Sequence, residues 1–364
     1  MKKHRLLENV RVIDLSQYIP GPFATRQLAD LGAEVIKIEP PGGDPMRNFM
    51  HHKSQMPSPV YRHLNRGKRV CELNLKSESD KQALSGLIVD ADILLESFRP
   101  GVLARLGFDR ERLDQLNPGL IHCALSGYGQ DGPYAQRAGH DINYCALSSQ
   151  TIVSGIAEKP VIAYPPIADH AAALQASTLM LAALHARDKQ ETGIYLDISI
   201  TESILAWQYL PLLTDAKDRA TVILSGGAAC YNIYQCGDKG FVSLGAIEPG
   251  FWKNFCEAVN KPEWVERQYE SMPQKRLIKE VAGLMATGSI NHWRDLLDDI
   301  DCCFEVLFNA DDIAQQAQLK SRRALTAAGP TYPAWIDQQA VETATDFEQL
   351  DASEPLRWNS HTRR

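Results

Sequence analysis

One acidic residue stands where it could transfer protons. Asp169 lies in the segment PIADH (166–170), at the start of an alanine-rich stretch that predicts a long helix. The helix dipole and the free N–H groups stabilise a carboxylate at this position. Helix capping is therefore the alternative to a catalytic role for Asp169. Apolar neighbours favour burial, which raises a carboxyl pKa above about 3.9 and suits it to proton transfer. His170 faces elsewhere on a helix, so we expect at most a supporting role.

His140 and Glu248 are the other catalytic candidates. His140 lies in AGHDINY, after the loop GYGQDGP and at the expected start of a helix. Imidazole suits proton transfer near neutral pH, although most isolated histidines are structural and the adjacent Asp141 could cap the helix. Glu248 lies in GAIEP, between an expected strand and helix, where a carboxylate could equally be a cap. The sequence alone does not bring Glu248 to His140.

Basic residues gather in the first third of a chain that is acidic overall. With 45 acidic and 38 basic residues, the net charge of -7 disfavours a broad nucleic-acid or anionic-membrane surface. The basic positions, several at expected strand ends, are Lys37, Arg62, Arg66, Lys68, Arg69, Lys76, Arg99 and Arg105. A phosphate-rich ligand at the carboxyl edge of a parallel sheet would explain them, and so would ordinary surface charge.

Strands that alternate with helices predict a Rossmann-like parallel sheet, an α/β fold, to position these residues. Strands are expected at 10–15, 34–38, 69–75, 91–96, 120–126 and 195–199, and helices at 23–31, 78–88 and 167–187. Small alanine side chains in the last helix let another element approach closely. The first turn, SQYIPGP, lacks GxGxxG, so we expect no nicotinamide or flavin cofactor.

A chain of 364 residues exceeds what one ordinary core organises, so we expect two domains or one domain with a large insertion. The large domain is expected over 1–205, with a C-terminal segment, 328–364, that packs back on it. A linker at 206–224 leads to a smaller α+β domain at 225–320. That domain is expected to hold a hairpin at 229–242 and helices near 250–259, 273–285 and 290–299, whereas the tail after about residue 328 is expected to be irregular.

The eight cysteines contain no CxxC pair, so we expect reduced, mostly buried thiols and no metal site. Cys302 and Cys303 are interpreted as small core residues. The start MKKHRLLENVRVIDL has no signal-peptide core, and no uninterrupted apolar run is long enough to span a bilayer. We therefore expect a cytoplasmic protein without membrane or nucleic-acid partners.

At these residues the chain resembles the family III CoA-transferases of the L-carnitine and bile-acid type, a superfamily that also contains the α-methylacyl-CoA racemases. The matching segments, in order, include VRVIDLSQYIPGPFATRQLADLGAEVIKIEPPGGDP, NRGKRVCELNLK, ADILLESFRPGVLARLGF, LNPGLIHCALSGYGQDGP, AGHDINY and PIAD. The resemblance implies a Rossmann-like large domain, a small domain, and two chains interlocked as a homodimer. It implies an acyl-CoA substrate and no cofactor beyond its coenzyme A.

The resemblance also implies the roles of site residues. Coenzyme A would lie along Gln17, Tyr18, Leu73, Lys76, Ser97, Phe98, Arg99 and Arg105. His140 and Asp169 match the two proton-transfer groups of the racemase branch, and Glu248 matches the glutamate that supports the histidine. Family members often carry an adenine-side arginine where this chain has Pro40.

Two reactions remain open, and a racemase is the first. His140 and Asp169 would exchange protons on opposite faces of the carbon next to the thioester of a 2-methylacyl-CoA. N–H groups at the helix start beside Asp169 would stabilise the enolate oxygen. AGHDINY and GAIEP resemble this branch.

A CoA-transferase is the second. Asp169 would attack the thioester and move coenzyme A between carboxylic acids through an aspartyl-CoA intermediate. The run His170-Ala171-Ala172-Ala173, where racemases typically have an aromatic residue and glycines, resembles this branch. A catalytically silent CoA-binding protein is a third hypothesis, which the presence of all three candidate residues disfavours.

Overall fold

The structure is a computed structural model that describes residues 5–50, 57–190, 192–214, 218–351 and 354–359. The chain divides into two compact units. Unit 1 comprises Met1–Ser148, Pro165–Ala206 and Gln315–Arg364, and unit 2 comprises Ser149–Tyr164 and Trp207–Ala314.

These units differ from the predicted domains at three places: an internal stretch, the predicted linker, which groups with unit 2 from residue 207 onward, and the C-terminal end of unit 2. Ser149–Tyr164, expected within 1–205, groups with unit 2, and that unit ends at Ala314 rather than at 320. Arg219 of unit 2 explains the grouping, because its guanidinium donates to the carbonyls of Ile152 at 2.8 Å and Ile156 at 3.1 Å.

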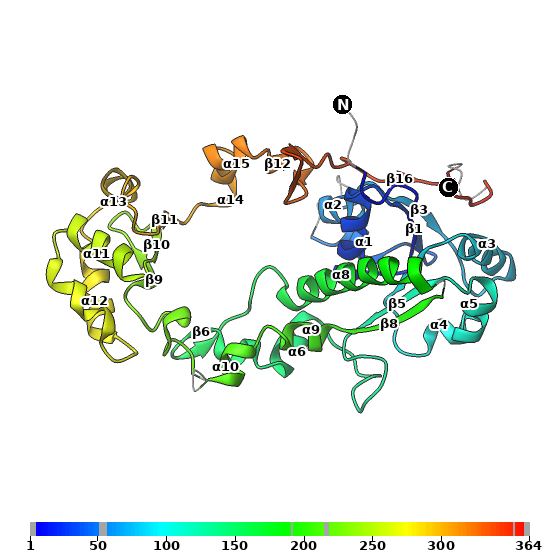
Figure 1. Ribbon diagram of the computed structural model, residues 1–364, viewed down its shortest axis with the longest axis horizontal. Coiled ribbons are helices and arrows are strands. Elements are labelled where there is room, and N and C mark those ends of the chain that lie inside the picture. Colours follow the sequence, from blue (N-terminus) through cyan, green and yellow to red (C-terminus); the bar gives the residue numbers. More distant parts are fainter. Residues whose placement is uncertain (1–4, 51–56, 191, 215–217, 352–353, 360–364) are drawn as a thin grey trace. The chain divides into compact units, whose positions relative to one another are not determined.

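Unit 1 is built on a seven-stranded sheet in which all neighbouring strands are parallel (Figure 1). The spatial order is β16 (Glu348–Gln349), β3 (Arg69–Glu72), β2 (Glu34–Glu39), β1 (Arg11–Asp14), β4 (Ile93–Glu96), β5 (Ile121–Ser126) and β8 (Ile194–Ser199). Apolar runs such as Val-Ile and Ile-Leu-Leu form these strands because helices cover both faces. The predicted parallel α/β sheet is confirmed.

Two helical layers enclose the sheet and bury separate apolar clusters on its faces. One layer contains α1 (Pro20–Asp30), α6 (Asp141–Leu147), α8 (Ile167–Gln190) and α9 (Ile200–Leu205). The other contains α3 (Glu78–Val89), α4 (Val102–Arg105) and α5 (Arg110–Leu116). The strand order reverses between β1 and β4, and open parallel sheets bind ligands beside such a switch point.

α8 is the element whose composition most needs an explanation. By length and composition alone Ile167–Arg187 could cross a membrane, although Asp169, His170 and Gln175 interrupt its apolar residues. Its buried alanines, Ala168, Ala171–173 and Ala176, instead lie in the core, where α1 packs against α8. Core packing therefore accounts for the apolar composition.

The C-terminal segment joins the sheet, which its sequence did not predict. β16 pairs with the edge strand β3, and Trp358 is buried with its indole N–H on the Leu87 carbonyl at 3.1 Å. The expectation of an irregular tail is wrong at β16. Two polar residues show no strand periodicity in the sequence, and they form a strand only because they pair with the available edge of β3.

Unit 2 has its own core between a three-stranded antiparallel sheet and helices. Its main elements are β9 (Tyr231–Gln235), β10 (Phe241–Gly245), β11 (Phe304–Val306), α11 (Pro249–Ala258), α12 (Lys275–Met285) and α13 (Ile290–Leu297). All eight cysteines of the chain are free and seven are buried. Cys303, interpreted as a core residue, is exposed in a left-handed turn with φ of 54°, so that interpretation is wrong.

The remaining elements are short. They are η1 (Pro45–Asn48), α2 (Pro59–Asn65), α7 (Gln150–Val153), β6 (Gly155–Ile156), β7 (Lys159–Pro160), α10 (Tyr209–Leu213), η2 (Ile223–Ser225), η3 (Pro262–Tyr269), α14 (Ala310–Ile313), α15 (Ala317–Ser321), β12 (Leu325–Thr326), β13 (Gly329–Pro330), β14 (Trp335–Ile336) and β15 (Gln339–Ala340).

Buried charges hold the turn after β1. Lys68 Nζ lies 3.0 Å from Asp14 Oδ2 and also donates to the Pro22 carbonyl at 2.9 Å, which ties β1 to the start of α1. Lys37 Nζ donates to the Ser16 carbonyl at 2.7 Å. Burial alone would raise the pKa of Asp14, but Lys68 and Lys37 hold it below its usual range. The network therefore fixes the chain immediately before the switch point.

We predict that Lys68→Met lowers the free energy of unfolding by about 3 kcal/mol, because it removes one partner of a fully buried ion pair. Urea unfolding at pH 7 measures the loss. Lys81→Met is the matched control, since Lys81 pairs with the exposed Glu78 and should cost about 0.5 kcal/mol or less. Equal losses in the two variants would contradict the assigned role of the Asp14 network.

Candidate active site

His140 and Asp169 lie at the starts of two helices that pack against each other. His140 immediately precedes α6, is exposed, and its N–H donates to Asn143 Oδ1 at 3.0 Å. Asp169 lies in the first turn of α8 and is partly buried. Because α6 contacts α8, the fold brings the two candidates to one corner of unit 1.

Asp141 joins the two helix starts. Its Oδ1 accepts the N–H of Ala168 at 2.7 Å and the N–H of Asp169 at 3.1 Å, while the Cys145 thiol approaches Oδ2 at 3.6 Å. This carboxylate belongs to the first turn of α6 and caps α8 from the neighbouring helix. The sequence suggested only a local cap, because nothing in AGHDINY indicates which distant helix the carboxylate reaches.

The pKa of Asp169 is raised to about 7, first by burial and then by the neighbouring Asp141 carboxylate. Such a group is partly protonated at neutral pH, so it can donate or accept a proton. Tyr144 is a neighbour of Asp169. The pKa of the Tyr144 hydroxyl is raised, first by burial and then by the charge of Asp169. That hydroxyl donates to the Gly139 carbonyl at 2.7 Å, which anchors the residue before His140.

The N–H groups beside Asp169 are not free for an enolate. We expected the start of α8 to stabilise the enolate oxygen, yet the N–H groups of Ala168 and Asp169 both donate to Asp141. Each N–H carries a single hydrogen. The expectation is therefore wrong for these two donors.

His170 and the alanines after it are explained by packing. His170 Nδ1 lies 2.5 Å from the Pro166 carbonyl, and its ring meets Phe23 edge-on at 4.9 Å. Ala171–173 are buried where α1 approaches, and Ser177 Oγ further along α8 donates to the Ala24 carbonyl of α1 at 3.3 Å. Small side chains at these buried positions let the neighbouring elements pack closely.

The predicted coenzyme A residues follow the carboxyl ends of three strands. Gln17 and Tyr18 follow β1, Leu73 and Lys76 follow β3, Ser97, Phe98 and Arg99 follow β4, and Arg105 ends α4. The Gln17 N–H donates to Ser97 Oγ at 3.1 Å, so β1 and β4 are linked at the switch point. Lys76, Arg99 and Arg105 are exposed.

Tyr18 connects these residues to His140. Its ring meets the His140 imidazole edge-on, with 6.0 Å between centroids and 78° between planes. Its backbone is left-handed, with φ of 64°, which is uncommon for a bulky residue and is found where the surroundings impose it. The residue predicted to contact coenzyme A therefore also borders the candidate histidine.

Most of the basic cluster is not available to a ligand. Five members form ion pairs: Lys37 with Asp44, Lys68 with Asp14, Arg66 with Asp30, Arg62 with Asp346 and Arg69 with Glu34. Three of these cations, Lys37, Arg66 and Lys68, are fully buried. A phosphate-rich ligand thus cannot explain the whole cluster, because sequence position near a strand end does not distinguish a buried cation from an exposed one.

Glu248 lies in unit 2. Its side chain is exposed and immediately precedes α11. The pKa of the Cys303 thiol is raised, first by burial and then by the negative charge of Glu248. Within the described ranges, no group of three or more histidine, cysteine, aspartate or glutamate side chains is arranged to hold a metal ion.

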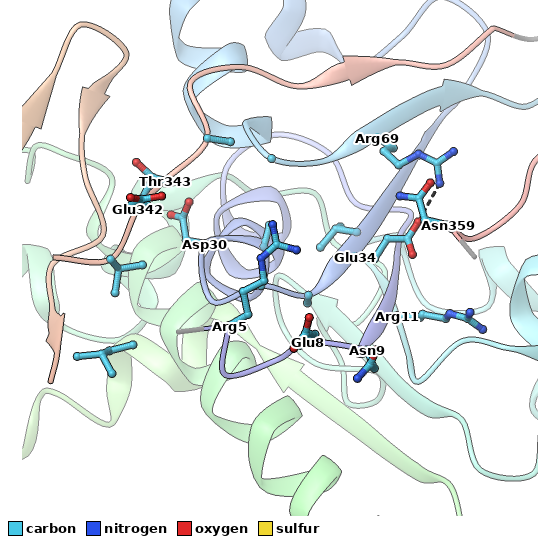
Figure 2. Close-up of a pocket in the computed structure, with 18 of the residues that line it drawn as sticks. Arg5, Glu8, Asn9, Arg11, Asp30, Glu34, Arg69, Glu342, Thr343 and Asn359 are labelled. Atoms are coloured by element: carbon cyan, nitrogen blue, oxygen red, sulfur yellow. Dashed lines mark hydrogen bonds and ion pairs between the residues drawn. The ribbon is translucent and has the colours of Figure 1, made fainter. Parts of the chain in front are cut away.

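A cavity of about 610 Å³ lies at the amino ends of the sheet's strands, opposite to the carboxyl ends that the predicted coenzyme A residues follow (Figure 2). It is lined at the amino ends of the strands by Arg11, Glu34 and Arg69, and farther along the chain by Glu342 and Thr343. None of the predicted catalytic or coenzyme A residues lines it, although Arg69 of the basic cluster does. Carboxyl ends of parallel strands carry the ligand sites of such sheets, so we do not assign the active site to this cavity.

Comparison with known proteins agrees with the resemblance. The family profile described as CoA-transferase family III matches residues 7–356. The chain is 32% identical to the α-methylacyl-CoA racemase of Mus musculus, covering 90% of this chain and 84% of that protein. It is 34% identical to the succinyl-CoA–D-citramalate CoA-transferase of Chloroflexus aurantiacus, and the match covers 80% of this chain and 75% of that protein.

Solved structures show the same fold. A hypothetical protein from Mycobacterium tuberculosis matches with a TM-score of 0.81 and 26% identity, covering 96% of this chain and 98% of that one. A CaiB/BaiF family protein from Brucella suis matches with a TM-score of 0.80, covering 94% and 96%. The chain therefore belongs to CoA-transferase family III, and it is an enzyme of the acyl-CoA racemase or CoA-transferase kind.

Proposed function

We propose that this enzyme racemises or epimerises acyl-CoA substrates at the carbon next to the thioester, with 2-methylacyl-CoA as the expected type. The observation that carries this proposal is the junction of α6 and α8, where Asp141 links the start of the helix behind His140 to Asp169. Two groups able to transfer protons thus lie at helix starts that one carboxylate links. Glu248 would support the histidine, as the resemblance implies.

In the proposed reaction, neutral His140 takes the α-proton from one face and the protonated Asp169 carboxyl delivers a proton to the other. The two residues exchange roles for the opposite enantiomer. A pKa of about 7 supports this assignment, because a substantial fraction of Asp169 then carries a proton at neutral pH. Coenzyme A would lie at the switch point, with Lys76, Arg99 and Arg105 as the exposed cations for its phosphates.

CoA transfer between carboxylic acids is the second candidate. It is supported by the alanine run after Asp169, which resembles the transferase branch, and by relatives that are named as CoA-transferases. Asp169 would then be a nucleophile, and His140 would be structural. A nucleophilic role favours an ionised carboxylate, whereas the raised pKa favours the protonated form.

One enantiomer of 2-methylacyl-CoA in deuterated water, without an acceptor acid, separates the two reactions. The wild-type enzyme should exchange the α-proton and racemise the substrate. His140→Ala should abolish racemisation and leave only the α-proton exchange that Asp169 performs. Asp169→Ala should leave only the exchange that His140 performs. In each variant the proton transfer that depends on the missing residue should slow by roughly a hundredfold or more. His170→Ala is the matched control and should keep most activity, because His170 binds backbone.

Wild-type enzyme that transfers coenzyme A to an acid but exchanges no α-proton would overturn the racemase proposal. The transferase reaction also predicts that hydroxylamine traps an acylated or CoA-linked Asp169. In that case Asp169→Ala would eliminate activity and His140→Ala would be mild.

The Asp141 carboxylate should set the pH range of the reaction. Asp141→Asn keeps an oxygen that accepts both N–H groups but removes a negative charge, so the pKa of Asp169 should fall. Protonation by Asp169 at pH 7 should slow roughly fivefold, and the alkaline limb of its pH–rate profile should move to lower pH. Carboxyl titration by infrared or NMR spectroscopy provides an independent readout. Asp131→Asn, in an exposed loop, is the control; an unmoved profile in Asp141→Asn would refute this role.

We also propose that the protein is a homodimer. The resemblance implies it, and large apolar side chains on unit 2 support it: Trp207, Tyr209 and Leu213 are 47%, 58% and 81% exposed. Sedimentation velocity at nanomolar concentration should show no monomer. A folded, active monomer would contradict this proposal.

A further inference from the structure

A buried glutamate lies directly before the predicted coenzyme A loop. β4 ends at Glu96, and the next three residues, Ser97, Phe98 and Arg99, are the predicted ligands. This is the side of the switch point where the Gln17 N–H donates to Ser97 Oγ. The loop continues into α4, since the Val102 N–H donates to the Arg99 carbonyl at 3.0 Å.

The Glu96 side chain holds this loop by its backbone. Its Oε2 accepts the Phe98 N–H at 2.6 Å, a short bond that spans two residues of its own chain. Phe98 is partly buried against the apolar cluster on this face of the sheet, so its backbone and its ring are both fixed. Arg99, the next residue, is exposed.

Burying a carboxyl group at this position is costly. Glu96 is 5% exposed and the pKa of its carboxyl is raised to about 7, first by burial, with a further contribution from Asp197 on β8. His122 on β5 lies 4.0 Å from Oε1, too far for a hydrogen bond, and its two ring nitrogens have no hydrogen-bond partner within the described ranges. An apolar side chain would avoid this desolvation, so packing alone does not explain a glutamate here.

We propose that Glu96 is a positioning residue for coenzyme A: by accepting the Phe98 N–H, it orders the loop from Ser97 to Arg99 before the ligand binds. A preordered loop loses less conformational entropy on binding, so the effect should appear in affinity. The inference rests on the proposed function, since it requires coenzyme A to bind beside this loop. The catalytic step at Asp169 should be little affected.

A nearly isosteric pair of variants tests the hydrogen bond. Glu96→Gln keeps an oxygen that can accept the Phe98 N–H, whereas Glu96→Met keeps the length and removes the acceptor. Titration calorimetry with free coenzyme A on the full-length protein should give a Kd within about threefold of wild type for Gln and roughly tenfold higher for Met. KM for acyl-CoA should rise in parallel while kcat stays within about twofold. Glu96→Leu provides a second acceptor-free variant should the Met protein not fold.

Glu111→Gln and Glu111→Met, on the exposed side of α5, are the control pair and should bind coenzyme A like wild type. Met and Leu variants of Glu96 that bind as tightly as wild type would overturn the proposal, and so would a Gln variant as weak as the Met variant. A wild-type protein that does not bind coenzyme A would instead refute the proposed function, and the positioning role with it.

Discussion

The parallel sheet of unit 1 imposes the constraint on which the site depends, because every parallel strand delivers its carboxyl end to the same edge. The segments after β1, β3 and β4 are therefore gathered there although they are distant in sequence. Both faces of such a sheet need helical cover, and α8 provides it with alanines that let α1 come close. The same helix starts with Asp169, so core packing and candidate chemistry are joined in one element.

Charged groups next to this edge bind mainly backbone N–H and carbonyl groups. Lys68 and Lys37 neutralise Asp14 and bind carbonyls at the turn after β1. Asp141 caps α8 from α6. Each carboxylate accepts donors that would otherwise be unpaired inside the protein, and leaving such groups without partners costs more than an ordinary hydrogen bond gains. Polar residues in unit 1 thus determine where loops and helix starts lie.

The two possible reactions place opposite demands on Asp169. Proton donation needs the neutral carboxyl group, and nucleophilic attack needs the carboxylate. Burial and the Asp141 charge both favour the neutral form, which is why we favour proton transfer. The alanine run that resembles the transferase branch has a packing explanation in this fold, namely the close approach of α1. It therefore weighs less against the racemase than the sequence suggested.

The sequence by itself determined the α/β class, the main strands and α8, because apolar runs and their periods are local properties. It also singled out His140 and Asp169 as residue types suited to proton transfer. Only the tertiary structure decided that Asp141 caps α8, that Lys37, Arg66 and Lys68 are buried in ion pairs, and that β16 completes the sheet. These depend on contacts between residues far apart in the chain, and whether a charge meets solvent or a buried partner is fixed only when those contacts form.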